Sequence, residues 1–326
     1  CPMSDDVPSA PTDDGLVPVT GEGDEEALAE ANDVFLRHGK RLVLYSSSSR
    51  GPISAERWQR LLESRRQEVY VRKETVADSL RRLSDEVTQM LADSVLSVDE
   101  KIVNLYSTTS VAMSAVLRTR LTSEGLMALT DYVESTVPFI ANNPSAVLGL
   151  QSLMAHDYTT YAHSASVYIH TVALASWMRA VSRETLRLLG LGAILHDIGK
   201  TQISSEILQK PTSLTDEEWK QMKRHPELGV KMLRELGDVP VLAQTLTVQH
   251  HERCDGSGYP LGLTRSLMNP LSHIVIVADM YDALTKARTY RPPHTPFEAL
   301  KVLKEDAGTR ISANTFRALV LMLASQ

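Results

Sequence analysis

The stretch His196-Asp197-Ile198-Gly199-Lys200 sets a histidine beside an aspartate, and a second adjacent pair, His250-His251, follows later in the chain. His225 lies between the two pairs and Asp279 lies beyond them. Neutral imidazoles and carboxylates are the ligands that divalent first-row metal ions require. An aspartate can also bridge two metal ions with its two oxygens. These residues therefore predict a metal site that could hold two ions.

Length and composition bound the class of protein. The chain has 326 residues, which suggests about two domains at roughly 150 residues each. Hydrophobic residues make up 43% and charged residues 23%, an ordinary globular composition. The predicted division is a disordered acidic tail over 1–22, a small α/β module over 23–75, a helical connector over 76–140 and an all-α domain over 141–326. The clearest break is Asn142-Asn-Pro-Ser145, which places the boundary between about 125 and 145.

Local patterns give the expected elements of the first module. Residues 27–35 have a helical pattern, whereas 41–45 and 67–71 have the pattern of strands. Ser54 is a candidate N-cap for a helix through Leu62. After residue 72 few alternating stretches occur, and capping boxes at 215–218 and 295–298 mark helix starts. The C-terminal half is therefore predicted to be all-α.

A narrow apolar seam marks the first helix of the connector. Its members alternate in steps of four and three, a spacing used where helices pair; they are Val76, Leu80, Leu83, Val87 and Met90. The seam permits two interpretations. A homodimer could form through the 76–90 helix, or the helix could pack within its own subunit.

Charge is distributed unevenly along the chain. Ten acidic residues and no lysine or arginine precede Arg37, so the remainder has 30 acidic against 34 basic residues. This mildly basic remainder suits an anionic small molecule, but it falls far short of the bias expected of a nucleic-acid-binding protein. We therefore expect no nucleic acid among its partners.

Cysteines and apolar runs bear on the compartment. With only Cys1 and Cys254 there is no disulfide framework, which fits a reducing compartment. The densest apolar run, 186–195, is far shorter than the ~20 residues that span a bilayer, and it contains Arg187. Since no secretory signal is found either, the sequence predicts a cytoplasmic protein without a membrane span.

A family resemblance follows from these strings. Residues 196–200 resemble the HD motif of the HD hydrolase superfamily, and 250–260, HHERCDGSGYP, resemble the HHE…DGxGYP signature of the HD-GYP type. The resemblance extends over about 150–320 and includes further matching blocks in the family's order, namely 161–164, 208–211, 224–229, 276–283 and 288–291. It implies a metal-dependent phosphodiesterase that hydrolyses cyclic di-GMP to pGpG, with further hydrolysis to GMP as an open alternative.

The resemblance also implies a ligand set. One metal ion would be held by His163, His196, Asp197 and Asp279, and the second by Asp197, His225, His250 and His251, with Asp197 bridging. The two cofactor ions would be divalent, with Fe or Mn favoured. A hydroxide between them would attack phosphorus. Asp197 and Lys200 are thus the candidate catalytic residues.

The candidate substrate contacts come from the same resemblance. Lys200, Arg288 and Arg291 match positions that resemble phosphate contacts, and cations suit an anionic diester. Tyr259 could stack on a guanine or could pin its own loop. In the family this loop is also implicated in contacts with diguanylate cyclase domains, which makes such a domain a candidate partner beside cyclic di-GMP.

Two observations qualify this assignment. Some family members carry a glutamate, used for a third metal ion, four residues before the first histidine ligand. Here that position is Thr159, so we expect two metal ions. The spacing of His156, His163 and His170 is seven residues, so a simple helical stripe could explain all three. Only His163 lies in a block that matches the family.

Two other functions remain open. One is an enzyme of the same superfamily that acts on another cyclic dinucleotide or a nucleotide, since only the GYP string points to cyclic di-GMP. The other is a non-catalytic sensor or scaffold that binds the nucleotide, which degenerate ligands would support. The sequence shows no degenerate ligand position.

Overall fold

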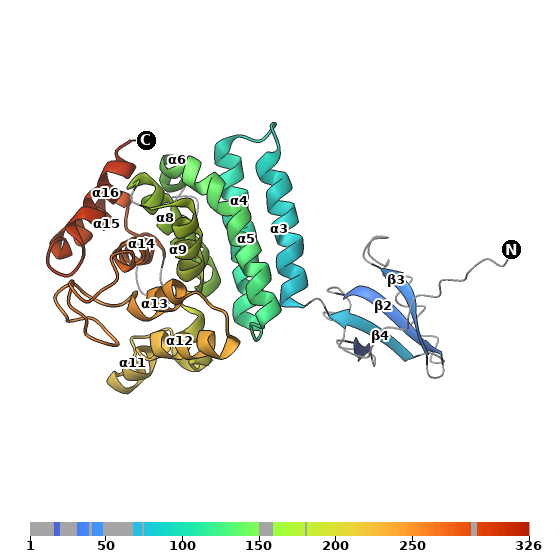
Figure 1. Ribbon diagram of the computed structural model, residues 1–326. Coiled ribbons are helices and arrows are strands. Elements are labelled where there is room, and N and C mark those ends of the chain that lie inside the picture. Colours follow the sequence, from blue (N-terminus) through green and yellow to red (C-terminus); the bar gives the residue numbers. More distant parts are fainter. Residues whose placement is uncertain are drawn as a thin grey trace. The chain divides into compact units, whose positions relative to one another are not determined.

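The computed structural model describes residues 16–19, 31–38, 41–47, 68–73, 75–149, 159–179, 181–287 and 292–325. The chain forms two compact units, Cys1–Thr75 and Val76–Gln326. Figure 1 shows strands in the first unit and helices throughout the second. The mainly helical fold predicted from the sequence is confirmed.

The described part of the first unit is a four-stranded antiparallel sheet with the strand order β1-β4-β2-β3. The central strand β2 carries the buried side chains of Val34 and Phe35. The strands are β1 (Leu16–Val19), β2 (Ala31–His38), β3 (Arg41–Ser47) and β4 (Glu68–Lys73).

Two expectations for this unit are corrected by the sheet. The predicted helix over 27–35 is wrong where it is described, because residues 31–38 form β2. Residues 16–19, assigned to the disordered tail, form β1 and pair with β4. The strands expected at 41–45 and 67–71 are confirmed by β3 and β4. The helix expected from Ser54 to Leu62 lies outside the described residues.

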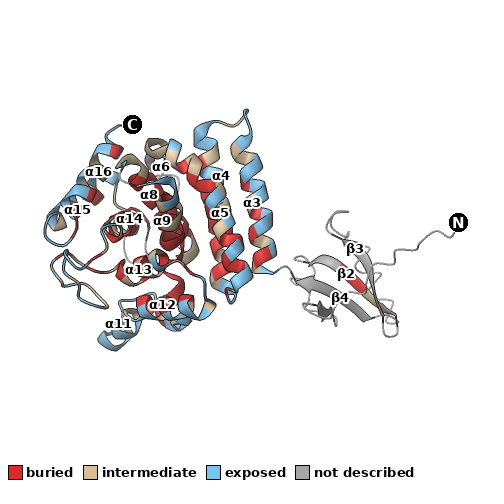
Figure 2. Cartoon of the chain, viewed as in Figure 1, coloured by how far each residue is buried: buried red, intermediate tan, exposed pale blue. Residues whose placement is uncertain are grey.

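The second unit begins with three long helices, α3 (Val76–Ala92), α4 (Val98–Arg118) and α5 (Ser123–Asn142). A capping box between Ser97 and Glu100 starts α4, and the side chain of Thr122 caps α5. These helices share one hydrophobic core with the helices that follow them. Figure 2 colours the buried residues of these helices red.

The apolar seam of α3 is used inside this unit. Leu80, Leu83 and Val87 are buried, and α3 packs against α5 and α4. Burial of each such side chain contributes about 1.5–3 kcal/mol. The seam therefore packs within its own subunit, which is one of the two interpretations that the sequence permitted. A homodimer through this helix stays a prediction.

The remaining helices surround a central one, α8 (Thr160–Trp177), whose side chains from Ala162 to Ala175 are all buried. Its close neighbour α9 (Arg183–Leu195) approaches at Gly190, where a Cβ would lie 2.9 Å from the ring of Tyr168. The other helices are α6 (Pro144–Gly149), η2 (Ile198–Gln202), α10 (Ser205–Leu208), α11 (Asp216–Met222), α12 (His225–Leu236), α13 (Val241–Gln249), α14 (Ser272–Thr285), α15 (Pro296–Asp306) and α16 (Ala313–Leu323).

Both capping boxes expected from the sequence are present. The side chains of Thr215 and Thr295 accept hydrogen bonds from the backbone N–H groups of Glu218 and Glu298, and each glutamate bonds back. Among the described residues, no helix combines the length and the apolar character needed to span a bilayer.

Candidate metal centre and active site

The seven predicted metal ligands come from the ends and inner faces of five helices. His196 and Asp197 follow the last residue of α9, His225 begins α12, and His250 and His251 follow the last residue of α13. The remaining two, His163 of α8 and Asp279 of α14, lie within helices. The fold thus brings together residues that are more than a hundred positions apart in the chain.

Their donor atoms form two groups in space. The atoms within each group all lie within 4.8 Å of one another. One group is His163, His196 and Asp279, and the other is Asp197, His225, His250 and His251. All are buried except His251, which is partly exposed.

Asp197 faces both groups, one carboxylate oxygen toward each. Its Oδ1 lies 3.2 Å from His225 Nε2 and 3.6 Å from His250 Nε2. Its Oδ2 lies 3.3 Å from His196 Nε2 and 3.6 Å from His163 Nε2. This is the arrangement that a carboxylate bridging two cations requires.

Backbone carbonyls set the orientation of three imidazoles. The Nδ1 atoms of His196, His225 and His250 lie 2.7, 2.8 and 2.7 Å from the carbonyl oxygens three residues earlier in the chain. Since a carbonyl oxygen only accepts hydrogen bonds, each Nδ1 must donate. The neutral rings therefore direct the lone pair of Nε2 inward, as metal-ligating histidines do.

These inward nitrogens fit a cation. His225 Nε2 and His250 Nε2 lie 3.0 Å apart, so two neutral rings would direct lone pairs at each other. The buried Nε2 of His196 makes no hydrogen bond to the described residues. A metal ion between these nitrogens and the carboxylates would satisfy all of them. The residues present therefore fit a metal centre.

The protonation states of these residues also suit a metal ion. Burial alone would raise the pKa of Asp197, yet the charge of Lys200 holds it well below its usual value. Burial lowers the pKa of His250 to about 4 and also lowers the pKa of His251. At neutral pH the carboxylate is ionised and these rings are neutral, which are the forms that bind metal ions.

His163 differs because carboxylates hold it on both sides. Its Nε2 lies 3.1 Å from Asp279 Oδ1, and its Nδ1 lies 2.7 Å from Asp282 Oδ2. Burial would lower its pKa, but the hydrogen bonds to Asp279 and Asp282 raise that pKa to about 9. Its surroundings thus favour positive charge at this ring, which a metal ion on Nε2 would also supply.

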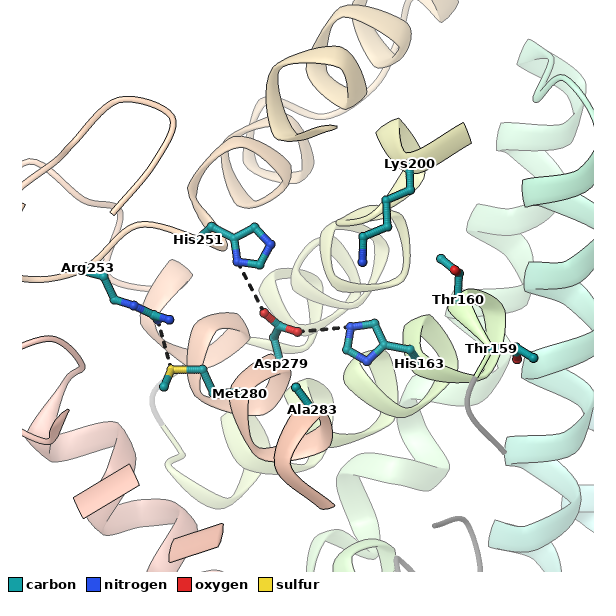
Figure 3. Close-up of a pocket in the computed structure, with 9 residues that line it drawn as sticks. All are labelled: Thr159, Thr160, His163, Lys200, His251, Arg253, Asp279, Met280 and Ala283. Atoms are coloured by element: carbon teal, nitrogen blue, oxygen red, sulfur yellow. Dashed lines mark hydrogen bonds and ion pairs between the residues drawn. The ribbon is translucent and has the colours of Figure 1, made fainter. Parts of the chain in front are cut away.

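A pocket of about 200 Å³ opens beside the first group. Figure 3 shows Asp279 between His163 and His251, with Lys200 and Arg253 extending from opposite sides. Lys200 Nζ donates to Asp197 Oδ2 at 2.5 Å. Arg253 was not among the residues singled out from the sequence, although it stands inside the 250–260 signature. A volume of 200 Å³ suits a phosphodiester group better than a whole dinucleotide, because drug-sized ligands occupy roughly 300–1,000 Å³.

Thr159 also borders this pocket, at the start of α8. Its hydroxyl accepts the backbone N–H of Ala162 as the N-cap of the helix. Thr159 therefore has a structural role, since it caps α8 and forms part of the pocket wall. The expectation of two metal ions instead of three stays a prediction.

The loop after His251 is held from within. Glu252 is fully buried, and its two oxygens accept the backbone N–H groups of Leu261 and Leu263 at 2.7 and 2.8 Å. The ring of Tyr259 stacks on His251, with 4.7 Å between centroids and 30° between planes. Tyr259 therefore supports a candidate ligand, as expected if it pins the loop.

Trp219 of α11 extends this row of rings. It meets Tyr259 edge-on with 6.4 Å between centroids, and 46% of its surface is exposed. Sequence reasoning did not single out Trp219, because a lone tryptophan on a short polar helix carries no motif. Arg288 and Arg291, expected to contact phosphate, lie outside the described residues.

Two further histidines, His170 and His273, belong to neither group. His170 is buried behind the centre against Tyr281, with 6.0 Å between ring centroids. His273 is within 3.8 Å of the buried thiol of Cys254. Of the histidines spaced seven residues apart, His163 is the one that belongs to a ligand group among the described residues.

Comparison with known proteins agrees with this geometry. The family model described as "HD domain" matches residues 129–314. The cyclic di-GMP phosphodiesterase PA4108 of Pseudomonas aeruginosa is 36% identical over 191 residues, which are 59% of this chain and 46% of that protein. The cyclic di-GMP phosphodiesterase response regulator RpfG of Xanthomonas campestris is 36% identical over 152 residues, 46% of this chain and 40% of that protein.

A relative with another substrate and a solved structure complete the comparison. The 3'3'-cGAMP-specific phosphodiesterase 3 of Vibrio cholerae is 34% identical over 160 residues, 49% of this chain and 34% of that protein. This chain thus spans less than half the length of each of these relatives. The solved structure of Bd1817, an HDG"Y"P protein from Bdellovibrio bacteriovorus, has a TM-score of 0.62 at 20% identity, covering 95% of this chain and 99% of that one. This likeness shows the fold.

Proposed function

This chain belongs to the HD domain family, and within it to the HD-GYP type, and we propose that it hydrolyses cyclic di-GMP to pGpG, with GMP as an alternative end product. The observation that carries the proposal is the position of Asp197, with one oxygen toward each of two histidine groups beside a pocket flanked by cations. Two relatives that act on cyclic di-GMP support the substrate.

The proposed ligands divide between two divalent ions as the geometry divides them. His163, His196 and Asp279 would hold one, and His225, His250 and His251 the other, with Asp197 shared. Fe and Mn are the favoured ions, since both accept imidazole and carboxylate ligands. When bound, such ions supply a nucleophile at neutral pH and offset the negative charge on phosphorus.

The chain's own side chains would bind and orient the diester. Lys200, already at the edge of the centre, would donate to a phosphate oxygen. Arg253 would bind a second anionic oxygen from the opposite wall, and Arg288 and Arg291 remain proposed contacts. Tyr259 orients His251 by stacking, and Trp219 offers an exposed ring at the end of that row for a base. A diguanylate cyclase domain as partner stays a prediction.

The direct test is product analysis. The protein, loaded without oxygen with Fe(II) or Mn(II), is incubated separately with cyclic di-GMP and 3'3'-cGAMP, and the products are separated by chromatography. We expect pGpG or GMP from cyclic di-GMP. Turnover of 3'3'-cGAMP alone would overturn the substrate but keep the reaction. Intact substrates from protein with metal bound would overturn the reaction and favour a binding role.

Arg253→Met tests the binding wall of the pocket. The guanidinium is expected to bind the substrate equally in the ground and transition states, so its loss should raise KM and leave kcat nearly unchanged. The rise should be about 10- to 100-fold, as for one or two charge-assisted hydrogen bonds. Steady-state kinetics measure both constants. Arg183→Met, which removes an exposed arginine from the start of α9, is the matched control. An unchanged KM in Arg253→Met would contradict the assignment.

A further inference from the structure

A buried ammonium lies behind the candidate metal centre. Lys286 follows the last residue of α14 and is 1% exposed. Its Nζ donates to the hydroxyl of Tyr106 at 2.6 Å and lies 4.7 Å from the centroid of that ring. Tyr106 belongs to α4 and is itself buried. Lysine is almost never fully buried unless paired, and desolvation of its charge costs several kcal/mol, so the position calls for an explanation.

Asp282 stands between this ammonium and the centre. It is fully buried and lies one helical turn before Lys286, whose backbone N–H donates to its carbonyl at 3.1 Å. Its Oδ2 accepts the Nδ1–H of His163 at 2.7 Å. The other nitrogen of His163 faces Asp279 and Asp197. Asp282 thus contacts one candidate ligand and is linked through the backbone of α14 to Lys286, whose ammonium is bound to α4.

We propose that Lys286, anchored by Tyr106, is a positioning residue that holds Asp282 against His163 and so sets the affinity of the group His163, His196 and Asp279 for its metal ion. The inference rests on the proposed two-metal site. It adds residues outside the ligand set and assigns them to one of the two ions.

The physical reason lies in how a carboxylate acts on a ligating imidazole. A carboxylate that accepts Nδ1–H fixes the plane of the ring and makes Nε2 a stronger donor to the metal. Asp282 can hold that place at low cost only if its own buried charge is offset. Lys286 and Asp282 are both buried and lie one helical turn apart, a spacing at which opposite charges interact, and the hydrogen bond to Tyr106 of α4 holds the ammonium in place.

The other group has a different support. The Nδ1 atoms of His225 and His250 donate to the backbone carbonyls of Met222 and Thr247, which belong to the chain just before each ring. Neither support involves Lys286. Loss of the ammonium is therefore expected to weaken the binding of one ion and to leave the binding of the other unchanged.

Metal titration tests this asymmetry. Wild-type protein, Lys286→Met, Lys286→Arg and Tyr106→Phe are stripped of metal, titrated with Mn(II) under competition by a chelator, and checked for bound ions by elemental analysis. We expect two ions in the native protein. In Lys286→Met one of them should bind about 10- to 100-fold more weakly, the usual effect of removing a partner of a ligating group. Lys286→Arg should recover most of the loss, and Tyr106→Phe should show a smaller loss in the same direction.

Tyr132→Phe is the matched control. Its hydroxyl is also buried and bonds the hydroxyl of Thr109 on α4 at 2.8 Å, not the ammonium of Lys286. It should lower stability like Tyr106→Phe and leave both metal affinities unchanged. If Lys286→Met does not fold, the pair of tyrosine variants decides the matter.

The outcomes separate this inference from the proposed function. If the wild-type protein takes up two ions, and folded Lys286→Met or Tyr106→Phe binds both with unchanged affinity, the positioning role alone is overturned. Equally weakened metal binding in Tyr132→Phe would also overturn the positioning role. A native protein that takes up no metal would overturn the metal site itself, and this inference with it.

Discussion

Asp197→Ala is expected to remove the phosphodiesterase activity while the protein stays folded. Each group of ligands loses an oxygen, because Asp197 presents one oxygen to each. Charge stabilisation by bound metal supplies several kcal/mol, and about 1.4 kcal/mol is a factor of ten. Turnover should therefore fall by at least about 10³-fold. Chromatography of the products and elemental analysis of bound metal measure the two effects.

Two further variants make that result specific. Asp197→Asn keeps the volume of the side chain and should be nearly as inactive, since a neutral amide is a poor ligand for two cations. Asp85→Ala removes an exposed carboxylate of α3 and should change nothing. Circular dichroism verifies folding in each. Persistent turnover by folded Asp197→Ala would refute the proposed site.

Gly199→Ala is expected to damage the centre through the backbone. A Cβ at Gly199 would overlap the carbonyl of His225 and lie 2.5 Å from the backbone nitrogen of Gly229, so η2 and α12 would have to move apart. Overpacking of this kind costs about 1–3 kcal/mol of folding free energy. Because η2 follows Asp197 and α12 begins with His225, activity should fall by about 100-fold, the effect of a ~1 Å displacement.

Urea unfolding and turnover measure the two losses in Gly199→Ala. Gly125→Ala in α5 is the control, because there the new Cβ would meet only the movable side chain of Leu121 at 3.0 Å and neighbours at 3.5 Å. That variant should keep its activity. If Gly199→Ala has the stability and activity of the wild-type protein, the close approach of η2 and α12 is not required for either property.

The error in the first unit shows where local patterns fail. Residues 27–31, Ala-Leu-Ala-Glu-Ala, are strong helix formers, and they favoured a helix through residue 35. The structure has a strand from Ala31, paired with β3 on one side and β4 on the other. Pairing on both edges outweighs a propensity of a few tenths of a kcal/mol per residue. The strands at 41–45 and 67–71 were predicted correctly because valine, tyrosine and leucine make up most of them.

The helical seam shows a second limit. The steps of four and three from Val76 to Met90 identified the buried stripe, but they could not say what covers it. An intramolecular partner and a second copy bury the same side chains and give the same pattern. Only the position of α5 and α4 in the fold distinguishes them.

The sequence by itself determined the helical class of the C-terminal half and the donor types, because these depend on residue identity and short spacing, and its resemblance to the HD-GYP type supplied the candidate ligands and their division into two groups. Tertiary structure decided which oxygen of Asp197 faces each group and which residues stand behind them. Arg253, Trp219 and the pair Tyr106 and Lys286 belong to this second set. Their roles depend on contacts between helices far apart in the chain, and such contacts leave no local periodicity to be read.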